Sequence, residues 1–217
     1  MTKPFKLEPK AREFADELAE ILNGTVCAGI RLSHVMSSSG ISFIGHKITQ
    51  QLLSRADGFE LGGRKHSGIY MSLSYQLVPD DQREYLMVSS SFVGLSTDAR
   101  SRQELIHFDY ERDKSHGYPE AHMQVFGSSN AWSAALKECG KPLSALHLPV
   151  GGRRFRPTLE DILEFLIVEG LVDGHQGWSE VVQKHREEFH RNQLWAAIRR
   201  SPDEVREAYR VLHGETI

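Results

Sequence analysis

Two short histidine-containing segments near the middle of the chain hold the residues best suited to acid–base chemistry. In an extended strand, side chains point alternately to the two faces, so residues two positions apart share a face. If the apolar residues of each segment face a core, His107 and Asp109 share the opposite face of one strand. His122 and Gln124 then share the opposite face of the other strand. Pairing of the two strands would bring all four side chains together, because opposite residues lie only about 5 Å apart.

Such a grouping suits more than one function. Two histidines can act as general base and general acid in metal-independent phosphodiester cleavage, because an imidazole titrates near neutral pH, and Asp109 would orient one ring. His107, Asp109 and His122 could instead bind a divalent metal as a two-histidine, one-carboxylate site. The histidines are closely spaced for that pattern, so we assign no metal ligand, and no cofactor is identified. The third alternative is a polar patch facing solvent, since antiparallel sheets routinely leave one face wet.

An arginine-rich loop follows the second glycine of Gly151-Gly152. Arg153, Arg154 and Arg156 offer guanidinium groups that can bind phosphate or carboxylate with two hydrogen bonds each. The loop runs into a helix predicted to start at Thr158, and a helix N-terminus also favours anions. The three arginines are therefore candidate phosphate-binding residues. The alternative is a surface loop whose arginines pair with acidic residues of the following helix.

Other histidines carry less information. His185 and His190 lie on a predicted helix together with Trp178 and Trp195. Core packing or a surface that faces a partner explains this group better than metal ligation.

The composition bounds the class of protein. The chain has 217 residues, 40% hydrophobic and 25% charged, which is typical of a globular protein. A net charge of −3 argues against non-specific coating of nucleic acid, which needs a surplus of positive charge. Cys27 and Cys139 lie far apart without zinc-ligand spacing and suit a reducing compartment. The apolar runs are far shorter than the roughly 20 residues of a membrane span, so we expect no membrane association and a cytoplasmic location.

The hydrophobic periodicity predicts helices at both ends and strands between them. The clearest strand lies at 69–77, where apolar and polar residues alternate, and a turn leads to its partner at 85–95. The other predicted strands cover 26–35, 41–44, 105–110 and 121–126. The predicted helices cover 9–22, 130–139, 158–167, 179–200 and 202–213.

These elements predict an α+β fold. We expect an antiparallel β-meander of five to six strands, with an N-terminal helix and a C-terminal helical layer on one face. Residues 1–217 are interpreted as a single α+β domain, sheet-rich over 24–126 and helical over 130–217. The apolar faces of strand 69–77 and helix 159–167 should form much of the core.

Two stretches resemble a known group of sequences. The stretches HFDYERDKSHGYPEAHMQVFGSS and LHLPVGGRRFRPTLEDILEFLIVEG resemble those of an uncharacterised actinobacterial protein family of unknown function, over residues 68–200. This resemblance implies a bacterial intracellular accessory protein and assigns no site residues. A fainter likeness exists to toxin proteins of toxin–antitoxin pairs, in which a tyrosine-bearing hairpin precedes an aspartate strand and a histidine-rich strand. The present chain differs from them in spacing and lacks the histidine-rich ending.

The function expected from the sequence is that of a small phosphodiester- or nucleotide-directed enzyme, similar to a ribonuclease-like toxin. Its partner would be an RNA or nucleotide substrate. The alternatives are a non-catalytic module that binds a protein partner through its exposed sheet face or terminal helices, and a metal-binding protein.

Overall fold

The fold was examined in a computed structural model of the chain. The structure describes residues 5–53, 57–62, 68–114, 117–151 and 156–214. The helices are α1 (Leu7–Thr25), α2 (Asn130–Ala135), α3 (Leu159–Val168), α4 (Trp178–Arg200) and α5 (Pro202–His213), with a short 3₁₀ turn, η1 (Leu143–Ala145). The strands are β1 (Ser33–Met36), β2 (Ser42–Gly45), β3 (Phe59–Glu60), β4 (Tyr70–Pro79), β5 (Leu86–Ser96), β6 (Glu104–Glu111), β7 (Ala121–Val125) and β8 (Leu148–Pro149).

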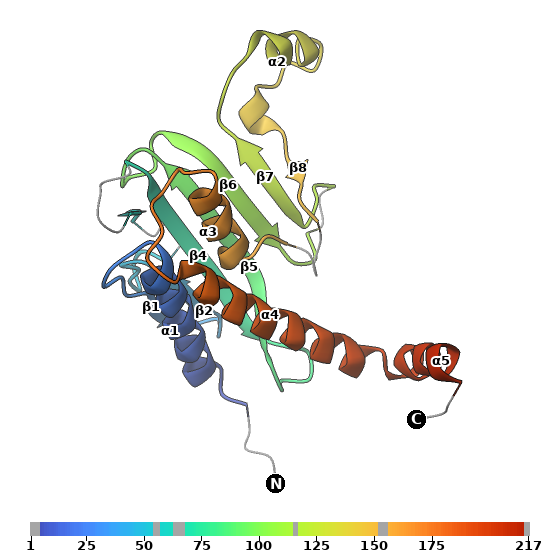
Figure 1. Ribbon diagram of the computed structural model, residues 1–217. Helices are drawn as coiled ribbons and strands as arrows, with labels where there is room; N and C mark the ends of the chain where they lie inside the picture. The colour runs from blue at the N-terminus through green and yellow to red at the C-terminus, as the bar shows by residue number, and fades with distance from the viewer. Residues whose placement is uncertain (1–4, 54–56, 63–67, 115–116, 152–155, 215–217) are drawn as a thin grey trace.

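The strands form one antiparallel sheet in the order β1-β2-β4-β5-β6-β7-β8, with β3 paired to β4 (Figure 1). The long β4–β5 hairpin lies at its centre, as the strict alternation of 69–77 predicts. Met71, Leu73 and Leu77 are fully buried on one face of β4. The expected α+β fold is therefore confirmed, and the eight strands exceed the expected five to six because two of them have only two residues.

Helices α1 and α3 cover the apolar face of the sheet, and their buried stripes pack against the residues of β4 and β5 (Figure 1). Helix α3 begins at Thr158, whose side-chain oxygen accepts a hydrogen bond from the Asp161 amide while the Asp161 carboxylate accepts one from the Thr158 amide. This reciprocal cap satisfies backbone groups at the helix start that would otherwise lack partners. The cap fixes where α3 begins and which of its faces meets the sheet.

Helix α4 packs on α1 and α3 and then leaves the body of the protein, carrying α5 at its end (Figure 1). Arg186 of α4 joins Asp161 and Glu164 of α3 through its guanidinium group, at 3.1 and 2.5 Å. The C-terminal helical layer is thus partly confirmed in its placement. Only the first half of α4 belongs to this layer, because the buried residues of α4, Val182 and His185, lie there. Helix α5 buries no residue along its described length.

Residues 126–150 leave the end of β7 and return along it, and the parts of this segment that contact β7 are η1 and β8. This excursion carries α2 and η1 and returns as β8, which pairs with β7 (Figure 1). The sheet therefore extends past residue 126, where the sequence predicts the end of the sheet-rich part. No helix among the described residues has the length and apolar content needed to cross a membrane.

Candidate functional site on the second sheet face

The pairing of β6 with β7 brings the four chemically suggestive residues together. His107 lies opposite Gln124, and Asp109 lies opposite His122. Tyr110, of the other parity, is buried on the helix-covered face. The alternation of the strands therefore produces the convergence that the sequence predicts, and we call these four residues the histidine cluster.

Asp109 lies between the two imidazoles of the histidine cluster. Its Oδ2 is 3.6 Å from Nε2 of His107 and 3.6 Å from Nε2 of His122. Nε2 of His107 is also 2.6 Å from Oε1 of Gln124, which makes this nitrogen a donor, because an amide oxygen can only accept. The Gln124 amide nitrogen in turn donates to the Ser144 carbonyl at 2.7 Å. One carboxylate is thus shared by two rings, and Gln124 ties the cluster to η1.

The protonation pattern of His122 follows from its backbone partner. Nδ1 lies 3.2 Å from the Pro119 carbonyl oxygen, so Nδ1 carries the hydrogen and Nε2 of the neutral ring presents its lone pair to Asp109. Burial lowers the pKa of His122, while the Pro119 carbonyl and the Asp109 carboxylate partly oppose that shift. Two hydrogen-bond acceptors, Nε2 of His122 and Oδ2 of Asp109, therefore face each other across 3.6 Å.

Aromatic rings enclose His107. Its ring centroid is 5.2 Å from that of Phe92 and 5.5 Å from that of Phe126. Phe92 can lie beside it because Gly94 has no side chain; a Cβ built at Gly94 would be only 2.7 Å from the Phe92 ring. On the remaining side, Nδ1 of His107 is 3.7 Å from Oε2 of Glu104. The glycine on β5 thus shapes the wall of a site whose polar groups lie on β6 and β7.

His147, to which the sequence assigns no role, closes the site over His122. The short strand β8 places His147 with its ring centroid 4.6 Å from that of His122 and 4.0 Å from that of Tyr118. Burial lowers the pKa of His147, and the positive charges of Lys114 and Lys141 lower it further. A two-residue strand is too short to produce a periodic pattern, so its position beside β7 was not readable.

The expectation of a solvent-facing patch is wrong for the two histidines. His122 is 1% exposed and His107 is 8% exposed. The rings of Phe92 and Phe126 lie beside His107, and the ring of His147 lies beside His122. Asp109 remains the open member of the cluster, with 34% of its side chain exposed.

The arginine-rich loop does not join the cluster through its described residue. Arg153 and Arg154 lie outside the described residues. The Arg156 guanidinium carbon is 4.9 Å from the Tyr110 ring centroid, on the helix-covered face of the sheet. Because Tyr110 and Asp109 are consecutive on a strand, they point to opposite faces. Arg156 therefore cannot hold a phosphate against the histidines, contrary to expectation.

The histidine cluster does not form a compact metal-ligand set. Among the described residues, one group of three has ligand atoms that all lie within 4.8 Å of one another, and it consists of Glu17, His185 and Glu188. Ligands of one small divalent ion must surround it closely, at about 2 Å each. The arrangement around Asp109 suits proton transfer better than metal binding.

Comparisons of the chain with models of known protein families, with curated proteins and with solved structures found no match.

Proposed function

We propose that the histidine cluster is an acid–base site that cleaves phosphodiester bonds in RNA. The observation that carries this proposal is the 3.6 Å gap between two acceptors, Nε2 of His122 and Oδ2 of Asp109. Neither atom carries a proton when His122 is neutral, so a hydroxyl group that lies beside the pair can donate its hydrogen to one of the two. A hydroxyl placed there is positioned for general-base activation.

In this proposal, His122 removes the proton from an attacking hydroxyl. The ribose 2′-hydroxyl attacks the adjacent phosphorus, the bond to the 5′-oxygen breaks, and a 2′,3′-cyclic phosphate forms. His107, with carboxylate oxygens 3.7 and 3.6 Å from its two ring nitrogens, donates a proton to the departing oxygen. The Asp109 carboxylate, 3.6 Å from Nε2 of both rings, stabilises the positive charge of the ring that is protonated during the reaction. Its exposed side chain marks the side from which substrate reaches the gap.

Lys114 and Lys141 are the described cations that can attract phosphate at the cluster, since Arg156 lies on the other face of the sheet. The charge of Lys114 acts on both His122 and His147, and that of Lys141 acts on His147. Lys114 is also 3.2 Å from Glu111 and lies over the Tyr118 ring. These cations lie on the same sheet face as the cluster and can attract the phosphate backbone of a single-stranded substrate.

A cleavage assay tests the proposal directly. We expect the purified protein to cut an end-labelled single-stranded RNA in the presence of EDTA and to leave the DNA of the same sequence intact, because DNA lacks the attacking 2′-hydroxyl. Asp109→Asn, which keeps the shape of the side chain, should lower the rate about 100-fold or more.

The matched control is Asp81→Asn, the same chemical change at an exposed carboxylate in the turn between β4 and β5. It should keep the RNA cleavage rate within about threefold of the parent if the cluster carries the activity. Absence of RNA cleavage by the parent protein, or equal rates for the parent and Asp109→Asn, would sink the proposal.

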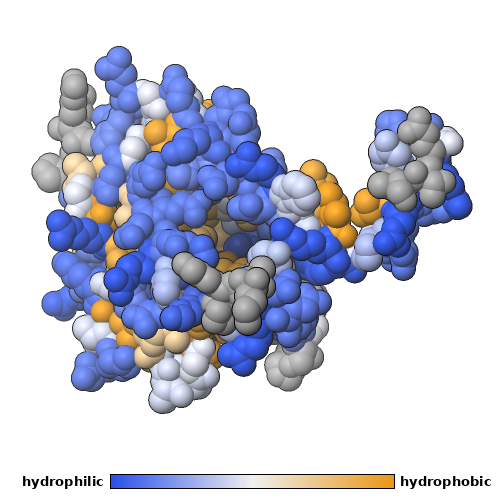
Figure 2. Space-filling view, turned by 90° about the horizontal axis from the view of Figure 1, so that it is seen from below, coloured by the Kyte–Doolittle hydropathy of each residue, from blue (hydrophilic) through white to orange (hydrophobic). Residues whose placement is uncertain are grey.

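A second candidate function is protein binding through the projecting arm, defined as residues 190–213 of α4 and α5. The arm carries exposed apolar side chains, including Leu194, Trp195, Val211 and Leu212 at 60, 52, 72 and 76% exposure. Figure 2 shows hydrophobic surface on this arm, apart from the body. Its charges pair internally, Arg206 with Asp203 and Arg210 with Glu207.

Size-exclusion chromatography with light scattering tests whether the projecting arm forms a dimer. We expect the parent protein to have twice the chain mass of 24.6 kDa, and Leu212→Glu to return it to the mass of one chain. A charge in the middle of an apolar contact removes the hydrophobic gain and buries an unpaired carboxylate. Leu171→Glu, at an exposed leucine elsewhere, should leave the dimer intact. A parent protein that elutes as a single chain would refute this candidate.

A further inference from the structure

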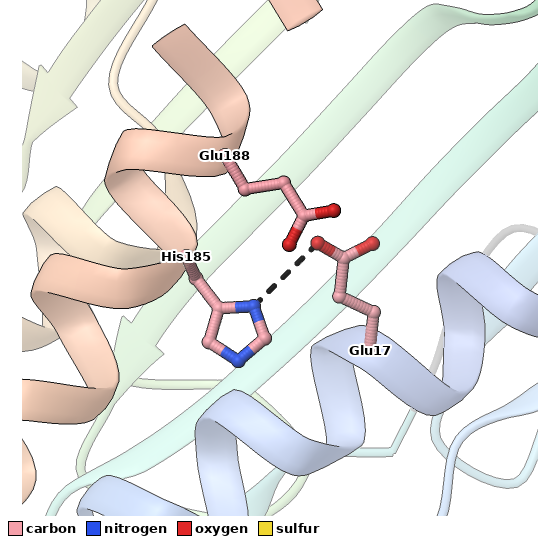
Figure 3. Close-up of side chains that lie close together, drawn as sticks. All are labelled: Glu17, His185 and Glu188. Atoms are coloured by element: carbon pink, nitrogen blue, oxygen red, sulfur yellow. Dashed lines mark ion pairs between the residues drawn. The ribbon is translucent and has the colours of Figure 1, made fainter. Parts of the chain in front are cut away.

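Helices α1 and α4, from opposite ends of the sequence, contact each other through a cluster of acidic residues around one histidine. Glu17 and Glu20 are three positions apart on α1 and so share a helix face. His185 and Glu188 have the same spacing on α4. Figure 3 shows the Glu17 and Glu188 carboxylates and Nδ1 of His185 turned toward one another. The cluster lies between two helices of the helical layer, whereas Asp109 lies on the opposite face of the sheet.

His185 is the unusual member of this cluster. It is 3% exposed, and neither ring nitrogen has a hydrogen-bond partner among the described residues. Nδ1 is 3.6 Å from Oε1 of Glu17, and Nε2 is 3.6 Å from Oε1 of Glu20, both too far for a good hydrogen bond. Buried polar atoms are nearly always paired, since an unsatisfied one is costly. An imidazole aimed at carboxylates in this way therefore points to a missing ligand.

We propose that Glu17, His185 and Glu188 bind a divalent transition-metal ion that joins α1 to α4. Their ligand atoms lie within 4.8 Å of one another. Ligand atoms around a tetrahedral ion with bonds of about 2.0–2.2 Å lie about 3.3–3.6 Å apart, so small side-chain rotations close the site. Both glutamates are only partly buried.

The donor set decides the class of metal. One imidazole nitrogen with two carboxylate oxygens suits Zn²⁺, Co²⁺ or Mn²⁺, whereas Ca²⁺ and Mg²⁺ prefer oxygen ligands alone. Three protein ligands leave at least one position for water. The electrostatics agree: burial raises the pKa of Glu17, and although His185 opposes that shift, the neighbouring Glu188 carboxylate adds to it. A cation between the two carboxylates would remove this repulsion.

Glu20 supplies the supporting interaction that metal-bound histidines usually have. When Nδ1 of His185 faces the metal, Nε2 carries the hydrogen and points toward the Glu20 carboxylate. Such a carboxylate fixes the ring and strengthens it as a ligand. Glu20 is itself held by the Lys184 ammonium group at 3.0 Å.

Binding to tag-free, full-length protein tests the site. After removal of metal with EDTA and then of the EDTA itself, titration calorimetry with Zn²⁺ should give one saturable site per chain, with Co²⁺ and Mn²⁺ weaker and Mg²⁺ without effect. At a free Zn²⁺ concentration 100-fold above Kd, the melting temperature should rise by about 5–10 °C.

The variants separate ligation from folding. Glu188→Gln and Glu17→Gln should each weaken Zn²⁺ binding at least about 10-fold and abolish most of the melting shift. Both positions are partly exposed, so the proteins should remain folded. Glu187→Gln is the matched control, a neighbouring carboxylate that accepts a hydrogen bond from Gln183 instead, and it should bind as the parent does. No saturable Zn²⁺ binding by the parent, or unchanged binding by Glu17→Gln and Glu188→Gln, would overturn the proposal.

Discussion

His122→Gln is expected to lower the rate of RNA cleavage about 100- to 10,000-fold, the range typical for loss of a general base. Glutamine is similar in size to histidine and can form hydrogen bonds, but it cannot take up a proton at neutral pH. The expectation depends on the backbone contact at Pro119, which directs the Nε2 lone pair of His122 toward the gap beside Asp109. The measurement is the single-turnover rate at saturating protein.

The pH dependence gives this prediction a second readout. Burial lowers the pKa of His122, so the ring is already neutral at pH 7 and competent as a base. As pH falls through that lowered pKa, the ring gains a proton and kcat/KM should fall, with a midpoint below the ordinary imidazole value of about 6.5. The residual activity of His122→Gln should lack this acidic limb.

His190→Gln is the control for His122→Gln, because His190 is exposed on α4 and undergoes the same chemical change. Circular dichroism and a melting curve should show that both variants are folded. Equal rates for His122→Gln and His190→Gln would remove His122 from the mechanism, and an acidic limb that persists in His122→Gln would assign the titration to another group.

Leu163→Ala is expected to reduce the free energy of unfolding by about 2–5 kcal/mol, the range for removing a buried leucine side chain. Leu163 is fully buried on α3 and belongs to the cluster that joins this helix to α1 and the sheet. The loss combines less burial of apolar surface with the cavity left in a layer that cannot collapse freely. Urea unfolding of the parent and the variant, fitted with the same dependence of free energy on urea concentration, measures the difference in stability.

The control for the core is Leu171→Ala, the same truncation at a leucine that is 45% exposed just after α3. It should change the free energy of unfolding by no more than about 0.5 kcal/mol. A cost for Leu163→Ala below about 1 kcal/mol would contradict the docking of α3 on the sheet. The metal content of all samples must be equal, because a bound ion would add its own contribution to stability.

The sequence by itself determined the fold class and the composition of the histidine cluster. Alternation in a strand has a period of two, so the apolar residues of β6 and β7 are enough to predict which face of each strand carries the histidines. The short connection between β6 and β7 then made them neighbours. These are local rules, and they place His107, Asp109, His122 and Gln124 on one face without any knowledge of distant contacts.

Tertiary structure alone decided what surrounds that cluster. The pairing of a strand as short as β8 with β7 has no sequence signature, and it brings His147 over His122. The sequence therefore left open whether His122 is buried or lies in a patch that faces solvent. The same holds for Arg156, whose position on the helix-covered face depends on how the chain returns from β8 to α3.

The cluster between α1 and α4 shows most clearly what local sequence patterns cannot predict. Glu17 and His185 are separated by most of the chain, and the periodicity of each helix says only which residues share its own face. Their meeting depends on the packing of two helix faces, which results from many weak apolar contacts summed over the whole layer. Local patterns thus determine the elements and their faces, while the partner of each face depends on interactions between distant parts of the sequence.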